Sequence, residues 1–372
     1  MRICYICNNE INERNQSKEH ILPNSIGGRL KSLDLLCRTC NSDFGAKSDA
    51  ELARQLNFIC NVLNIEREQG EPQPIIVENK KTGEKFKVTS DGQYQLKDPK
   101  VIQELNGEQV NINIEARTIK EAKQILISLK KKYPKLNVDE LLDKAINIEK
   151  EFIEPIQAEL IVGGKEIFLS ILKTALNYYI YKTKKIEAVK KAIEQLKENN
   201  SNLVEPIILE NFLYDVEESE INHSIFLHGN QKEKKLYAII EHFNIYHYIV
   251  KLSDEYYDED ISLLYVYDTI SKIEIPKKIK FNYLPSFIFQ YTYSNSDPLF
   301  HILQGRVDRI MKIAEKRNFD ELVSRLTGSV WKNTVDKIIP QGEPITEEAL
   351  RLFSSEIANK LSRYINLTKD KK

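Results

Sequence analysis

The sequence predicts an α+β fold, in which a small N-terminal module precedes a larger mixed α+β body. The module is indicated by four of the five cysteines, which stand in two Cys-x-x-Cys pairs: Cys4, Cys7, Cys37 and Cys40. A polar, Pro-containing stretch at residues 68–74 then indicates a linker. The body is indicated by strand-like and helix-like patterns that follow one another from residue 75 onward. We expect three segments, 1–68, 69–200 and 201–372.

The four paired cysteines predict a zinc site. Thiolates in pairs supply the four soft ligands that a tetrahedral structural Zn²⁺ takes, and they leave no open position for chemistry. We therefore expect a zinc-stapled module in which the metal ion holds the fold together. A capping box at Ser48 and Glu51 predicts the start of a helix over about residues 48–64. The fifth cysteine, Cys60, falls on the apolar stripe of this helix, so we expect it to be a buried core thiol.

Segments with regular patterns follow in the body. Helical spacing of apolar residues predicts four helices, at about 118–133, 165–183, 186–198 and 349–365. The breadth of the apolar face over 165–183 indicates a central, well-buried helix. Short strands with turns are predicted over 75–117, and strands again over about 205–293. In the second region we expect them at Ile207–Tyr214, Ser224–His228, Leu236–Leu252 and Ile261–Tyr267.

The composition is that of an ordinary globular protein. The chain has 372 residues, of which 41% are hydrophobic and 29% charged, and its formal net charge is -1. It holds no apolar run near the roughly 18 residues that span a membrane, so we expect no membrane partner. Metal-bound thiolates suit a reducing compartment, which favours a cytoplasmic protein. The balanced charge argues against nonspecific coating of DNA, but local positive charge can still bind nucleic acid.

The histidines of the body do not form a ligand set in the sequence. His242 and His247 share no helical face, and no cluster of carboxylates accompanies them. We interpret them as ordinary strand residues. Tyrosines alternate in the same region, from Tyr246 to Tyr267, which favours a half-buried sheet over a surface on which bases stack.

A further motif lies between and beside the cysteine pairs. Glu19-His20-Ile21-Leu22-Pro23 is followed by Gly27-Gly28 and then by Leu36-Cys37-x-x-Cys40-Asn41. In this order and spacing, the first 50 residues or so resemble the HNH endonuclease family, the ββα-metal nucleases. The resemblance implies two strands and a helix around one catalytic cation, Mg²⁺ or Mn²⁺. It also implies that His20 is the general base and that Glu19 and Asn41 hold the cation.

Physical chemistry supports these roles. Phosphodiester hydrolysis needs a base that titrates near neutral pH, and imidazole is such a group. A carboxylate and an amide oxygen are hard ligands that suit a divalent cation, whereas the thiolates select zinc. The sequence departs from the family at Glu19, where aspartate is usual, and at Asn41, which replaces a histidine. The middle asparagine of the family motif aligns with Ser32 or with Asp34, and this choice stays open.

Cationic residues around the motif are candidate contacts to nucleic-acid phosphates: Arg29, Lys31, Arg38 and Lys47. Residues 1–62 hold eight Lys or Arg against seven Asp or Glu, so the module as a whole is not basic. The other interpretation of these four side chains is solvated surface.

The sequence therefore predicts a metal-dependent DNA endonuclease with a restriction-like role or a role in antiphage defence. One active centre would nick DNA, or cut both strands as a homodimer. The body either reads DNA or senses a signalling nucleotide or a regulatory protein. RNA stays open as a substrate. The alternative from another class is a noncatalytic zinc-binding module that interacts with nucleic acid or protein.

Overall fold

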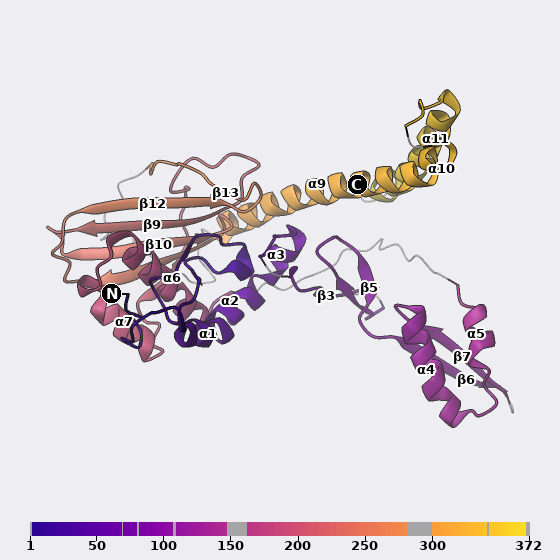
Figure 1. Ribbon diagram of the computed structural model, residues 1–372, viewed down its shortest axis with the longest axis horizontal. Helices are drawn as coiled ribbons and strands as arrows, with labels where there is room; N and C mark the ends of the chain where they lie inside the picture. Colours follow the sequence, from indigo (N-terminus) through magenta and orange to yellow (C-terminus); the bar gives the residue numbers. More distant parts are fainter. Residues whose placement is uncertain are drawn as a thin grey trace. The chain divides into compact units, whose positions relative to one another are not determined.

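The computed structural model describes residues 2–68, 70–79, 82–106, 109–146, 162–280, 300–340 and 342–369. Runs of helices and runs of strands follow one another along the chain, which confirms the α+β fold class (Figure 1). Contacts divide the chain into two compact units. Met1–Gln73 and Leu160–Glu315 form unit 1, and Pro74–Glu159 and Lys316–Lys372 form unit 2. The three segments bounded at 68 and 200 stay a prediction.

Unit 1 contains a six-stranded antiparallel sheet with the strand order β13-β12-β9-β10-β11-β8 (Figure 1). Its strands are β8 Val204–Ile207, β9 Asn222–Asn230, β10 Lys235–His242, β11 Tyr246–Ser253, β12 Ile261–Asp268 and β13 Ile273–Glu274. The predicted strand at Ile207–Tyr214 is wrong, because β8 ends where that prediction begins. Leu209, Leu213 and Tyr214 are instead buried in a small cluster with Phe226 of β9. Their apolar pattern therefore reflects packing rather than strand pairing.

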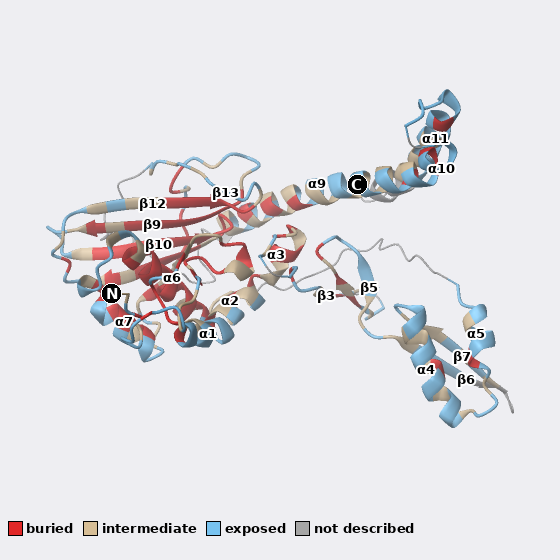
Figure 2. Cartoon of the chain, in the orientation of Figure 1, coloured by how far each residue is buried: buried red, intermediate tan, exposed pale blue. Residues whose placement is uncertain are grey.

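One face of this sheet is covered by α6 Lys165–Thr183, which contacts β8, β9, β10 and β11. Nearly every residue from Ile167 to Ile180 is buried (Figure 2), so the prediction of a central helix is confirmed. The short helix η2 Glu187–Val189 and α7 Lys190–Lys197 follow it. The prediction of one long strand over Leu236–Leu252 resolves into β10 and β11, which pair as a hairpin.

The N-terminal part of unit 1 has a ββα arrangement. Its elements are β1 Glu19–His20, η1 Asn24–Ile26, β2 Lys31–Ser32, α1 Arg38–Ala46, α2 Ser48–Gln55 and α3 Asn57–Val62. The prediction of one helix over 48–64 is wrong in part, since Leu56 separates α2 from α3. The capping box is also wrong. Because α1 runs almost to the start of α2, the Ser48 hydroxyl donates back to the Phe44 carbonyl, at 3.3 Å.

Cys60 lies on α3 and is fully buried, which confirms the prediction of a core thiol. Burial raises the pKa of this thiol to about 12. The thiol is therefore protonated and unreactive near neutral pH.

Unit 2 contains two small sheets and several helices. The strands are β3 Ile75–Glu78, β4 Lys85–Val88, β5 Tyr94–Leu96, β6 Lys100–Asn106 and β7 Gln109–Glu115. The helices are α4 Ile119–Lys132, α5 Val138–Asp143, α10 Val335–Ile338 and α11 Glu347–Lys369, and α9 Phe300–Asn333 begins in unit 1. Strands predicted over 281–293 lie outside the described residues. Within the described ranges, no helix is long and apolar enough to cross a bilayer.

Candidate functional site

The four paired cysteines come together at one point. Their sulfur atoms all lie within 4.8 Å of one another, and Cys7 Sγ is 3.7 Å from Cys37 Sγ. Ligands about 2.3 Å from a tetrahedral zinc ion are about 3.8 Å apart, so the arrangement fits Zn²⁺. Burial and the charge of Cys4 raise the pKa of Cys40 above its usual value. A bound cation would reverse this shift, because the thiolates coordinate it directly.

Strand β1 turns Glu19 and His20 to opposite sides, because side chains alternate along a strand. Glu19 is only 1% exposed, whereas His20 is half-buried. Its imidazole Nε2 lies 3.3 Å from a carboxylate oxygen of Glu68, although the two atoms are not aligned for a hydrogen bond. Burial lowers the pKa of His20, and the charge of Glu68 opposes this shift. A neutral imidazole of this kind can accept a proton near neutral pH.

The structure brings neither candidate for the middle motif position into a hydrogen bond with His20, among the residues that it describes. Ser32 lies opposite Glu19 in the β1–β2 pair. Its hydroxyl accepts a hydrogen bond from the Asp34 backbone N–H, at 3.1 Å. The charged group that lies beside the His20 imidazole is the Glu68 carboxylate, 48 residues after His20 in the sequence.

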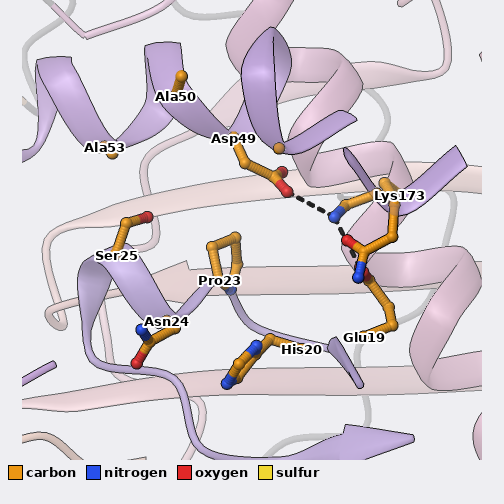
Figure 3. Close-up of a pocket in the computed structure, with 11 residues that line it drawn as sticks. Glu19, His20, Pro23, Asn24, Ser25, Asp49, Ala50, Ala53 and Lys173 are labelled. Carbon is orange, nitrogen blue, oxygen red and sulfur yellow. Dashed lines mark hydrogen bonds and ion pairs between the residues drawn. The ribbon is translucent and has the colours of Figure 1, made fainter. Parts of the chain in front are cut away.

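Glu19 and His20 line a cavity of about 220 Å³ together with residues from η1, α1, α2 and α6 (Figure 3). The other lining residues are Pro23, Asn24, Ser25, Asn41, Gly45, Asp49, Ala50, Ala53 and Lys173. A water molecule takes about 30 Å³ of the liquid. The cavity is thus large enough for a cation with several waters.

A buried lysine forms an ion pair with Glu19, the acidic residue of the motif. Lys173 Nζ of α6 lies 2.7 Å from Glu19 Oε1 and 2.6 Å from Asp49 Oδ2 (Figure 3). Burial alone would lower the pKa of Lys173, but the two carboxylates outweigh this and raise it above its usual range. Burial raises the pKa of Glu19, and the charge of Lys173 opposes that rise.

Two residues of the cavity wall, Glu19 and Asn41, carry oxygen atoms of the kind that a divalent cation binds. Asn41 Nδ2 donates to Ser17 Oγ at 2.6 Å, which leaves Oδ1 of Asn41 without a partner in the described part of the chain. Glu19 accepts both of its side-chain hydrogen bonds at Oε1, so the same holds for its Oε2. A carboxylate and an amide oxygen with added waters are ligands that Mg²⁺ and Mn²⁺ accept.

The four candidate phosphate contacts fall into two groups. Arg29 donates to Asn24 Oδ1 at 2.9 Å and to the Glu66 carbonyl at 3.0 Å, and Lys31 lies 2.5 Å from Glu68. Arg38 and Lys47 are exposed, at the start of α1 and directly after its end.

Comparison with known proteins decides the nature of this region. Residues 4–57 match the model of the HNH endonuclease family. The match confirms the resemblance drawn from the motif, and we call residues 4–57 the HNH segment. The HNH segment contains all four paired cysteines, Glu19, His20, Asn41 and Asp49, but neither Glu68 nor Lys173. No curated protein and no solved structure matches the chain significantly.

Sequence reasoning missed Asp49, Glu68 and Lys173. A signal existed for Lys173 alone, because it stands among Ile171, Leu172 and Ala175 in a helix expected to be buried. A buried lysine needs a carboxylate partner. The partner itself lies 154 positions away along the chain, at Glu19, and nothing in the sequence connects the two.

Four of the five histidines of the body lie on strands, and His301 lies on α9. Three of the strand histidines belong to a buried polar network. Glu241 accepts hydrogen bonds from Ser224 at 3.1 Å and from Asn244 at 2.9 Å, and it lies 2.6 Å from His247. His223 and His242 adjoin this network within the core. No pattern in the sequence predicted this network.

Proposed function

We propose that the protein is a metal-dependent endonuclease that hydrolyses phosphodiester bonds of DNA through the HNH segment. One observation carries the proposal: Glu19, His20 and Asn41 line the same cavity, beside four clustered cysteines. Glu19 Oε2 and Asn41 Oδ1 hold Mg²⁺ or Mn²⁺ in this proposal. The cation, when bound, stabilises the negative charge that develops on the scissile phosphate.

His20 is the general base in this proposal. It accepts a proton from the water molecule that attacks the phosphorus atom. Its lowered pKa supports the role, because the imidazole stays neutral and able to accept that proton. The Cys4, Cys7, Cys37 and Cys40 zinc ion has a structural role only.

The four cationic side chains contact the phosphates of the bound strand. Arg38 and Lys47 are exposed and need no rearrangement to do so. Arg29 and Lys31 take part in surface ion pairs with Glu66 and Glu68. Such pairs contribute at most about 1 kcal/mol, so phosphate oxygens can replace these partners at little cost.

The biological setting belongs to the proposal as well. A single centre nicks DNA, and a homodimer cuts both strands. We favour a restriction-like or antiphage effector in the cytoplasm, in which the body reads DNA or responds to a signalling nucleotide or a regulatory protein. RNA stays open as a substrate, because the described residues that line the cavity include no group that selects the sugar.

The deciding experiment measures nicking of supercoiled plasmid by the purified protein with Mg²⁺ or Mn²⁺, beside His20→Ala. We expect metal-dependent nicking that the variant loses, with one zinc ion per chain retained by both proteins. Equal nicking in the variant would refute the mechanism. Nicking by neither protein, with zinc bound, would leave two interpretations: an effector that awaits its activating signal, or the noncatalytic zinc-binding module.

A further inference from the structure

One face of α6 is complementary to the acidic residues of the HNH segment. Ser170, Lys173 and Asn177 are three and four positions apart, so they share a side of the helix. Ser170 Oγ donates to Asp49 Oδ1 at 2.6 Å, and Asn177 Nδ2 donates to Glu19 Oε1 at 2.8 Å. Lys173 lies between Ser170 and Asn177 along the helix. It contacts the carboxylates of both Glu19 and Asp49 (Figure 3). All three helix residues lie outside the HNH segment.

These contacts are almost completely buried. Lys173 and Glu19 are each 1% exposed, and Ser170 and Asn177 are not exposed at all. A buried ammonium group is stable only when opposite charges and hydrogen bonds surround it. The two carboxylates meet this need, and the three charged groups together carry one negative charge.

The contacts also distinguish the two carboxylate oxygens of Glu19. Oε1 accepts from both Lys173 and Asn177, whereas Oε2 has no hydrogen bond from the described residues. Because a carboxylate rotates about a single bond, two donors on one oxygen fix the position of the other. Oε1 therefore anchors the carboxylate, and Oε2 is the oxygen that can bind a further partner.

We propose that Lys173 is a positioning residue of the nuclease site: it holds Glu19 by Oε1 so that Oε2 is presented to the divalent cation. The inference rests on the proposed function and deepens it. Lys173 also lowers the negative charge that the cation meets. Lys173 thus fixes the geometry of the Glu19 ligand and lowers the affinity of the site for the divalent cation.

A purely structural ion pair would have different consequences. Removing it would lower the stability and leave the rate per correctly folded, metal-loaded molecule unchanged. A positioning residue instead changes that rate when the metal ion is fully bound. The two roles are therefore separated by measuring metal binding and cleavage independently.

The test compares Lys173→Met with Lys173→Arg in the full chain. Methionine keeps the length and removes the charge, whereas arginine keeps the charge. Because Lys173→Met leaves two buried carboxylates unpaired, a second variant combines it with Asp49→Asn. This double variant restores the net charge of the cluster and lacks only the ammonium group that holds Glu19. Mn²⁺ binding is titrated by electron paramagnetic resonance, zinc content is measured, and nicking is followed at saturating Mn²⁺.

We expect Lys173→Met to bind Mn²⁺ about tenfold more tightly, the size of effect that one unit charge has on a neighbouring divalent ion in a water-like dielectric. Nicking at saturating Mn²⁺ should nevertheless fall at least about tenfold in Lys173→Met and in the double variant. Lys173→Arg should keep most of the rate. Zinc content should not change.

A rate that returns to the wild-type value at saturating Mn²⁺ would overturn the proposal, as would loss of fold and zinc in both methionine variants. Unchanged Mn²⁺ affinity in Lys173→Met would overturn it too. If the wild-type protein does not nick any substrate, the proposed function fails on that observation. The Mn²⁺ titration then still decides whether Lys173 acts on the ligand carboxylate.

Discussion

The buried imidazoles of the sheet predict that the protein loses stability in mild acid. His223 of β9 and His242 of β10 face each other in the core, with their Nδ1 atoms 3.3 Å apart. His223 Nε2 lies 2.8 Å from the carbonyl oxygen of Ile26 in η1. Burial lowers the pKa of His223 to about 4, and burial together with the charge of His223 lowers the pKa of His242 well below its usual value.

The direction in which stability changes with pH follows from proton binding. Between pH 6.5 and pH 4 the unfolded chain protonates His223 and the folded chain does not, so stability is present above the unfolded pKa and falls as the pH decreases. With a pKa of about 4 in the folded protein and about 6.5 in the unfolded chain, this one group lowers the free energy of unfolding by about 2 kcal/mol between pH 8 and pH 5. His242 adds to the effect in the same direction.

The assay is urea unfolding of the wild-type protein and His223→Gln, followed by circular dichroism at pH 8, 7, 6 and 5. Glutamine keeps an amide donor for the Ile26 carbonyl but does not titrate. The variant should lose about 2 kcal/mol less than the wild type over this range. His301→Gln, at an exposed position of α9, is the control and should behave as the wild type does. Parallel pH curves for wild type and His223→Gln would refute the reasoning.

Two further predictions concern the cysteines. Cys37→Ala should remove one zinc ligand, and we expect zinc loss and a thermal unfolding transition lowered by several degrees, measured by metal analysis and calorimetry. Retention of stoichiometric zinc would contradict the four-cysteine site. Cys60 should react with a thiol reagent only as the protein unfolds, since it is buried and its pKa is about 12. Fast labelling of Cys60 in the zinc-loaded native protein would show that α3 opens readily.

The parts of the fold and site that could be predicted carry their information locally. The cysteine pairs and Glu19-His20 stand close together in the sequence, and each residue type has few common uses at that spacing. The helix at 165–183 was predictable because apolar residues recur over a broad face of it, which is typical of a buried helix.

The remaining parts depend on contacts between distant positions. Lys173 contacts Glu19 across 154 positions. Tyr5, between Cys4 and Cys7, donates to Asn177 at 2.7 Å across 172 positions. No local pattern encodes such a pair. In the segment after β8, a local pattern led to a wrong prediction. Leu209 and Leu213 have the spacing of strand residues, but they are buried by packing against the sheet.

The contacts between α6 and the HNH segment set the smallest piece of the chain in which the proposed nuclease function can be tested. A fragment that ends near residue 68 would contain every residue of the family match and still expose the carboxylates of Glu19 and Asp49 without their counter-charge. It would also lack the acceptor of the Tyr5 hydroxyl beside the clustered cysteines. Grafts of this HNH segment onto other proteins should therefore carry α6 and the sheet that supports it.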